Sequence, residues 1–168
     1  LLIEQNKTMN LTAITQPNEV VVKHFADSLS LLSAIEVPQG AKVLDLGTGA
    51  GFPGLPLLIA RPDIRLTMVD STAKKLAYVA STLDKLSLSA ETLHARAEEA
   101  GKDPAYREQS DIVCSRAVAA LSVLCEYCLP FVKVGGTFVA MKSAKAQEEL
   151  QLAEKAISTL GGKTVGQK

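Results

Sequence analysis

The sequence contains no tryptophan, and aromatic side chains make up 4% of its 168 residues. It therefore lacks the aromatic platform on which many single-strand binders stack bases. The 18 basic residues are balanced by 18 acidic ones, so the net charge is zero. This balance argues against a strongly basic nucleic-acid-binding protein and confines any contact with RNA to a local patch. No apolar run reaches the roughly 18 residues of a membrane span, and the first residues lack a signal-peptide layout, so no membrane partner is expected.

Cysteine is also scarce, with Cys114, Cys125 and Cys128 as the full set. An odd, small number of cysteines is typical of a reduced, cytoplasmic protein. Cys125 and Cys128 form a C-x-x-C pair, but no second ligand pair accompanies them. Because both lie in an apolar helical stretch, we predict that they pack in the core, and we expect no metal site.

What the sequence does have is a run of closely spaced glycines after an apolar strand. The strand over residues 42–46 leads into Gly47, Gly49 and Gly51, and a helix is expected to open near Pro53. About twenty residues after this loop, a second apolar stretch ends in Asp70. Glycines let the backbone turn tightly beside a ligand, and a carboxylate at the next strand end can accept hydrogen bonds from ribose hydroxyls. The pattern predicts a pocket for a nucleoside-bearing cofactor.

Two registers of this loop favour different cofactors. The dinucleotide pattern G-x-G-x-x-G fits Gly49, Gly51 and Gly54, but it leaves Asp45 and Gly47 at the strand end, where burial of an unpartnered carboxylate is costly. The pattern D-x-G-x-G-x-G, here Asp45, Gly47, Gly49 and Gly51, resembles the first motif of S-adenosylmethionine-dependent methyltransferases. We therefore favour a methyltransferase over a nicotinamide-dependent oxidoreductase, with a ligand-free glycine turn as the remaining alternative.

The hydrophobic pattern alternates between strands and helices along the chain. This alternation predicts one domain with a doubly wound, mostly parallel α/β sheet and helices on both faces. Gly135 and Gly136 are expected to turn into the fifth strand, and residues 164–165 to begin a sixth. The C-terminal hairpin that would complete such a sheet is expected to be missing. Strands are predicted over residues 42–46, 65–69, 91–94, 111–115 and 137–141, and helices over 19–35, 53–60, 72–86, 117–132 and 144–160.

Several longer motifs extend over nearly the whole chain. They are the block over residues 6–14 (NKTMNLTAI), residues 24–29 (HFADSL), the Phe52-Pro53-Gly54 extension, Val69-Asp70-Ser71 with Lys74-Lys75, Arg96-Ala97-Glu98, Ser115-Arg116-Ala117 and Met141-Lys142. With these motifs the sequence resembles the GidB/RsmG family of bacterial methyltransferases, which methylate N7 of a guanine in small-subunit (16S) ribosomal RNA. Ser143 departs from the family pattern, which usually has glycine there. The resemblance implies a Rossmann-like class I methyltransferase, with residues 1–38 as a helical extension that borders the active site.

The resemblance also implies a binding site for S-adenosylmethionine. Gly47, Gly49 and Gly51 are expected at the methionine end of the cofactor. Phe52 is expected against the cofactor, and Asp70 at the ribose hydroxyls. Ala97 and Glu98 follow the third strand, where such folds read the adenine. Arg116 ends the fourth strand and is expected to bind or position the cofactor, with a structural salt bridge as the alternative.

The substrate side is less defined, and no catalytic residue is assigned. Many amino-methyltransferases carry Asp/Asn-Pro-Pro-Tyr at the end of the fourth strand, whereas this chain has Ser115-Arg116-Ala117. That replacement suits N7 of guanine, which has a lone pair and no proton, so that the reaction depends on positioning. An arginine near the developing positive charge requires a compensating anion. The substrate-side candidates are Asn10, His24, Asp27, Ser28 and Lys142.

These candidates keep plainer alternatives. His24, Asp27 and Ser28 share a helix face by their three- and four-residue spacing, yet without the resemblance a histidine such as His24 is more often structural. Lys142 can meet a phosphate or remain a solvated lysine. The expected partner is small-subunit ribosomal RNA or the 30S particle, with no DNA, and the expected state is a monomer. A small-molecule methyltransferase with the same cofactor pocket is the alternative function, followed by a non-catalytic RNA-binding protein.

Overall fold

The computed structural model describes residues 1–116, 119–142 and 146–167, and its centre is a parallel five-stranded sheet. The strand order is β3-β2-β1-β4-β5, and every neighbouring pair is parallel. The reversal of direction from β1 to β4 creates a crevice beyond the carboxyl ends of the strands, where doubly wound folds bind ligands. The strands are β1 (Lys42–Leu46), β2 (Arg65–Asp70), β3 (Glu91–His94), β4 (Ser110–Arg116) and β5 (Val132–Met141).

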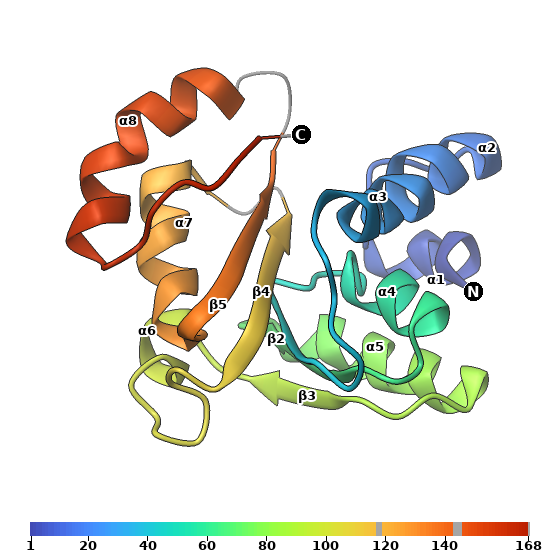
Figure 1. Ribbon diagram of the computed structural model, residues 1–168. Helices are drawn as coiled ribbons and strands as arrows, with labels where there is room; N and C mark the ends of the chain where they lie inside the picture. The colour runs from blue at the N-terminus through green and yellow to red at the C-terminus, as the bar shows by residue number, and fades with distance from the viewer. Residues whose placement is uncertain (117–118, 143–145, 168) are drawn as a thin grey trace.

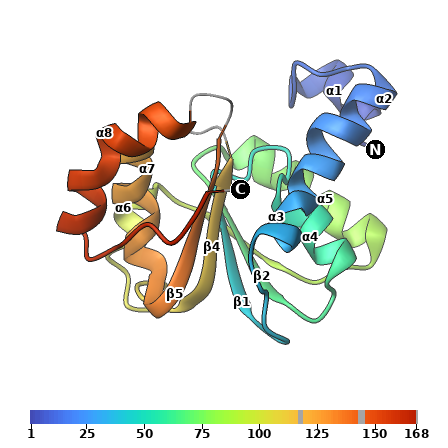
Figure 2. The same cartoon turned by 45° about the horizontal axis from the view of Figure 1, so that its top comes forward.

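Helices cover both faces of this sheet, as the predicted fold class requires (Figures 1 and 2). Alternate strand residues serve opposite faces: Val43 packs in the core under α3–α5, whereas Leu44 packs with α7. The first face carries α1 (Leu2–Met9), α2 (Pro17–Val20), the π-helix η1 (Val21–Ala26), α3 (Asp27–Ala34), α4 (Gly54–Ala60) and α5 (Ala73–Leu86); the second carries α6 (Ala97–Ala100), α7 (Leu121–Cys128), the 3-10 helix η2 (Leu129–Phe131) and α8 (Ala146–Thr159).

The N-terminal extension is built from consecutive helical pieces. α2, η1 and α3 follow one another without a break, so the helix predicted over residues 19–35 is one rod with a π-helical middle. α1 precedes it and ends at Asn10, which is left-handed with φ of 50°. Asn6 then ties down the following segment, because its side chain both donates to and accepts from the backbone of Thr12, at 2.9 Å each. The extension therefore presents a fixed loop over the first face of the sheet.

Two sequence predictions at the C-terminal half are wrong. Gly135 and Gly136 are not a turn before the fifth strand but lie inside β5, which begins at Val132. The pairing with β4 shifts register there, since Ser110 faces Val132 while Ile112 faces Thr137. A Cβ on Gly136 would lie 2.8 Å from the Asp111 carbonyl oxygen, so glycine permits this close approach.

The second error concerns the end of the chain, because residues 163–167 form no strand. The predicted helix start at residue 117 lies outside the described residues, and α7 begins at Leu121. Cys125 and Cys128 are buried in α7 among core side chains, which confirms their packing role. A search of the described helices identifies none that is long and apolar enough to span a membrane.

Candidate active site

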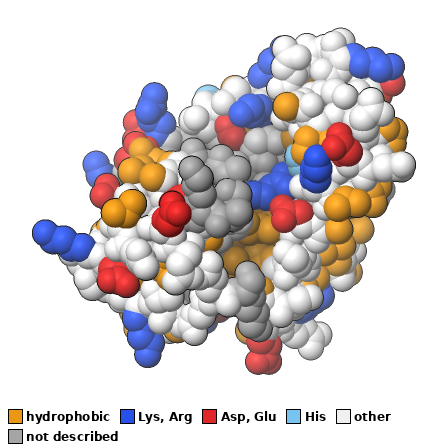
Figure 3. Space-filling model, turned by 90° about the horizontal axis from the view of Figure 1, so that it is seen from above, with side chains coloured by type: hydrophobic (Ala, Val, Ile, Leu, Met, Phe, Trp, Pro, Cys, Tyr) orange, Lys and Arg blue, Asp and Glu red, His pale blue; other side chains and the backbone are white. Residues whose placement is uncertain are grey.

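An open cavity of about 440 Å³ lies beyond the carboxyl ends of the strands, between the glycine loop and the N-terminal helices. Figure 3 looks down on this end of the sheet and shows both basic and acidic side chains around the hollow. Its volume is within the usual range for small-molecule sites. The described residues that line it are Leu11, Thr12, Ile14, Lys23, His24, Asp27, Gly47, Thr48, Gly49, Ala50, Phe52, Arg116, Met141 and Lys142.

The glycine loop forms one wall because its backbone is bent away from β1. The N–H groups of Gly47 and Thr48 donate to the Val69 carbonyl oxygen at 2.8 and 3.1 Å, which anchors the loop to β2. Gly47, Gly49 and Gly51 have φ values of 71°, 57° and 90°, a region that residues with a Cβ rarely adopt. A Cβ on Gly51 would also lie 2.3 Å from Cδ1 of Leu55. The loop consequently offers bare backbone to the cavity.

Asp45 lies beneath this loop, fully buried at the end of β1. Its Oδ2 accepts hydrogen bonds from the Thr48 hydroxyl at 2.6 Å and the Gly54 N–H at 2.9 Å. Its Oδ1 has no hydrogen-bond partner among the described residues. Burial raises the pKa of Asp45 to about 6, and the two hydrogen bonds oppose that rise. The carboxylate ties the loop to the start of α4, and a Cβ on Gly54 would lie 2.8 Å from Oδ2.

This geometry corrects one premise of the register argument. Burial of Asp45 was expected to count against the dinucleotide pattern, yet the carboxylate is buried here with two partners. Gly54 has a packing reason of its own, since it approaches both Asp45 and Met68 closely. The identity of the cofactor therefore depends on the comparisons below and not on this premise.

Asp70 ends β2 beside the loop and is mostly buried. Its Oδ2 accepts from the Gly49 N–H at 2.9 Å, and its Oδ1 accepts from the Thr72 N–H at 2.8 Å. An ionised carboxylate has about four acceptor positions, so each oxygen keeps capacity for a ligand hydroxyl. Bare loop backbone and a fixed carboxylate beside it are the features that a methionine-and-ribose ligand requires, so the residues fit S-adenosylmethionine.

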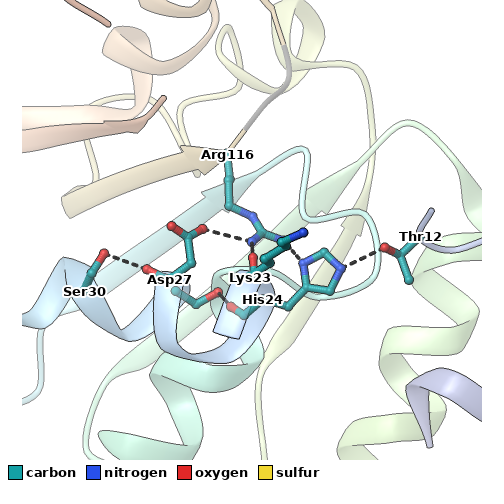
Figure 4. A network of polar contacts seen from close by, with 7 residues as sticks. Thr12, Lys23, His24, Asp27, Ser30 and Arg116 are labelled. Atoms are coloured by element: carbon teal, nitrogen blue, oxygen red, sulfur yellow. Dashed lines mark hydrogen bonds and ion pairs between the residues drawn. The ribbon is translucent and has the colours of Figure 1, made fainter. Parts of the chain in front are cut away.

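Arg116 joins the sheet to the N-terminal helices in the polar network of Figure 4. Its guanidinium donates to the Lys23 carbonyl oxygen at 3.0 Å, to Asp27 Oδ2 at 3.1 Å and to His24 Nδ1 at 2.9 Å. It also lies over the Phe52 ring, 5.2 Å from the centroid. Four contacts from two segments, the N-terminal rod and the glycine loop, hold this arginine at the mouth of the cavity.

His24 is held on both ring nitrogens. Because a guanidinium can only donate, Nδ1 accepts from Arg116, and the proton of the neutral ring is on Nε2. Nε2 then donates to Thr12 Oγ1 at 2.7 Å, and the ring stacks on Phe52 with centroids 4.7 Å apart. Burial and the neighbouring Arg116 charge lower the pKa of His24. At neutral pH the ring is therefore uncharged, with no free lone pair.

The other predicted residues lie at different distances from the cavity. Ser28 is fully buried and its hydroxyl donates to the His24 carbonyl oxygen, whereas Asn10 is exposed at the end of α1. Lys142 lines the cavity, but its ammonium donates to the Ala119 carbonyl oxygen at 2.6 Å and pairs with Glu149 at 2.8 Å. It is thus neither solvated nor free for a phosphate.

The two residues that were expected to bind the adenine lie at the start of helix α6, away from the cavity. Ala97 and Glu98 are the first two residues of α6, after β3, and they are not among the residues that line the cavity. The first N–H groups of a helix have no intrahelical acceptor, so both can donate to a ligand. Sequence reasoning missed Thr12 and Thr48 as site residues. Thr12 could have been found as the last residue of the NLT segment, and Thr48 as the residue between Gly47 and Gly49.

Comparisons with known proteins identify the family of this chain. The family model described as rRNA small subunit methyltransferase G (GidB) matches residues 1–167. Proteins named ribosomal RNA small subunit methyltransferase G from Pelotomaculum thermopropionicum and Alkaliphilus metalliredigens are 52% and 48% identical, over 97% and 100% of this chain and 69% and 71% of their own lengths.

Solved structures with the same fold are more distant in sequence. A SAM-dependent methyltransferase from Aquifex aeolicus is 20% identical, with a TM-score of 0.64 over 90% of this chain and 86% of its own. An O-methyltransferase from Thermotoga maritima is 18% identical, with a TM-score of 0.62 over 95% of this chain and 56% of its own. These likenesses confirm the Rossmann-like class I methyltransferase fold.

Proposed function

This chain belongs to the rRNA small subunit methyltransferase G (GidB) family, and we propose that it transfers a methyl group from S-adenosylmethionine to N7 of a guanine in 16S ribosomal RNA. The observation that carries the proposal is the shared cavity. One wall is the bare glycine loop and the other is the Arg116–His24–Asp27 network from the N-terminal helices. A methyl donor on one side and a target base on the other would meet between them.

The cofactor half of the proposal assigns roles to residues of the cavity wall and to Gly51, Asp70, Ala97 and Glu98, which lie outside its lining. Gly47, Gly49 and Gly51 would let the methionine part of the cofactor approach the backbone closely, because they have no Cβ. Asp70 would accept hydrogen bonds from the ribose hydroxyls. The aromatic group Phe52 and its partner Arg116 would border the reacting end. The free N–H groups of Ala97 and Glu98 would receive the adenine. S-adenosylmethionine supplies an electrophilic methyl group on a sulfonium.

The substrate half rests on the state of His24. A histidine that accepts from Arg116 and donates to Thr12 has no lone pair with which to take a proton. Methylation of a hydroxyl is commonly assisted by such a base, whereas guanine N7 already exposes its lone pair in the absence of a proton. The state of His24 is therefore compatible with a target nitrogen that needs positioning and no base, and Asp27 is the remaining acceptor among the described lining residues.

Membership of the rRNA methyltransferase family, and not the charge around the cavity, favours RNA over a small molecule. The overall charge is zero, and the three cations that line the hollow are each paired with an acid: Lys23 with Glu19, Arg116 with Asp27 and Lys142 with Glu149. The target base would leave its stack to enter the cavity.

We further propose that the substrate is the 30S particle, that the protein acts as a cytoplasmic monomer, and that residues 1–38 complete the active site of one domain.

The test is transfer of labelled methyl from S-adenosylmethionine to small subunits taken from cells that lack this protein, followed by nucleoside analysis. We expect 7-methylguanosine at one site. Asp70→Asn should weaken cofactor binding, and Asp84→Asn, an exposed acid on α5, is the matched control. Cofactor binding by the wild type without any transfer to subunits would redirect the assignment to a small-molecule substrate. An absence of cofactor binding would contradict the interpretation of the glycine loop.

A further inference from the structure

The cavity contains several polar side chains, but most of them are already engaged within the protein. Lys142 is paired with Glu149 and the Ala119 carbonyl oxygen. The ring of His24 uses both nitrogens, and Thr48 donates to Asp45. Among the described residues that line the cavity, Asp27 is the one acidic side chain. It is therefore the anionic acceptor that this site can offer to an incoming base.

Asp27 is held in place and yet remains accessible. It is the first residue of α3, and its Oδ2 accepts from Arg116 at 3.1 Å. The Asp27 side chain is 49% exposed, whereas the Arg116 side chain is 16% exposed. Because a carboxylate has about four acceptor positions, one contact with Arg116 leaves Oδ1 and part of Oδ2 for a ligand. Arg116 thus fixes the orientation of an acceptor that still faces the cavity.

We infer that Asp27 selects guanine by accepting hydrogen bonds from the N1–H and N2–H₂ groups of the target base. This inference rests on the proposed function. A base removed from its stack can be recognised along its Watson–Crick edge, and on that edge guanine presents two adjacent donors. Adenine presents a ring-nitrogen lone pair there, which a carboxylate repels. Asp27 would therefore attract the correct base and disfavour the wrong one, which is how strong discrimination arises.

The same carboxylate solves a charge problem. Methylation at N7 leaves the purine ring positively charged, and Arg116 lies in the same cavity. Two like charges in a partly enclosed site disfavour each other. The Asp27 carboxylate, 3.1 Å from Arg116, offsets the guanidinium and faces the charge that develops on the base. Recognition through N1 and N2 also leaves N7, on the opposite side of the purine, free for the methyl group.

The test measures whether Asp27 interacts with the N2 amino group of the target guanine. Wild type and Asp27→Asn are assayed on small subunits reconstituted with guanine or with inosine at the methylated position, since inosine lacks the N2 amino group. For the wild type we expect kcat/KM to fall about 10- to 100-fold on inosine, as for a hydrogen bond to a charged group. For Asp27→Asn we expect a loss of similar size on guanine and less than about 3-fold further loss on inosine.

Controls separate this inference from a structural role and from the function itself. Asp27→Asn should bind S-adenosylmethionine as the wild type does, Asp27→Ser should repeat its loss of preference, and Glu36→Gln, an exposed acid just beyond α3, should change nothing. An unchanged guanine-to-inosine ratio in Asp27→Asn would overturn the inference while the function stands. Wild-type protein that methylates neither subunit would overturn the proposed function and the inference together.

Discussion

Replacement of Asp45 by asparagine should make the free energy of unfolding less dependent on pH. Asp45 is fully buried, and Oδ1 has no partner among the described residues. Its folded pKa of about 6 is above the ordinary value of 3.8. The folded state therefore binds the proton more tightly than the unfolded state does. The favourable contribution of this group is complete below pH 3.8 and is lost as the pH rises through 6.

The size of the effect follows from the two pKa values. A rise from 3.8 to about 6, at 1.36 kcal/mol per pH unit, corresponds to about 3 kcal/mol at pH 7. Most of this is lost between pH 4 and pH 7, so the wild type should lose about 2 to 3 kcal/mol of unfolding free energy relative to Asp45→Asn over that interval. Asparagine keeps the acceptor for the Thr48 hydroxyl and the Gly54 N–H.

Urea unfolding at pH 4, 5, 6 and 7 measures this difference directly. All other titrating groups are common to both proteins, so the difference between the two curves isolates position 45. Asp84→Asn, which removes an exposed charge, should follow the wild type at every pH. A wild-type-to-Asp45→Asn difference that stays constant from pH 4 to pH 7 would refute the reasoning. So would a difference that grows in favour of the wild type at higher pH.

Three further substitutions test the site. Gly51→Ala adds a Cβ against Leu55 at a φ of 90°, and it should lower the unfolding free energy by about 2 to 4 kcal/mol and weaken S-adenosylmethionine binding in calorimetry. Thr12→Val leaves the His24 Nε2–H without its acceptor, and urea unfolding should show a loss of about 1 to 3 kcal/mol. Lys142→Met removes the tie at the cavity rim, so methyl transfer should fall at least tenfold while cofactor binding is retained.

Much of the sheet could be predicted because its signals are local. Buried parallel strands appear as short apolar runs between glycine and proline breaks, and β1 and β3 have the predicted bounds. The fifth strand was predicted wrongly because two consecutive glycines usually mark a turn. Here Gly136 instead permits close contact with the Asp111 carbonyl oxygen across a register shift. That requirement comes from a neighbouring strand and is invisible in a local window.

The loop residues of the site were predictable for a similar reason. Gly47, Gly49 and Gly51 adopt positive φ values that the sequence pattern already suggests. The state of Lys142 was not predictable, since its partner Glu149 belongs to a helix beyond the strand end and its other acceptor is a backbone carbonyl oxygen. A sequence places a lysine at the end of a strand, but it does not say whether an acid or a backbone oxygen lies next to it.

The least predictable feature, and the one with most chemical meaning, is the contact between Arg116 and the N-terminal rod. Arg116 and His24 are separated by 92 positions, and nothing in either segment specifies the other. The proposed methylation at N7 does specify a requirement, because an arginine near the positive charge that develops on the base needs an anion beside it. The fold meets that requirement when the end of β4 comes to the start of α3 and Asp27 lies 3.1 Å from the guanidinium. The same contact fixes the proton of His24 on Nε2, so one arginine both removes a potential base from the site and orients the acid that balances its charge.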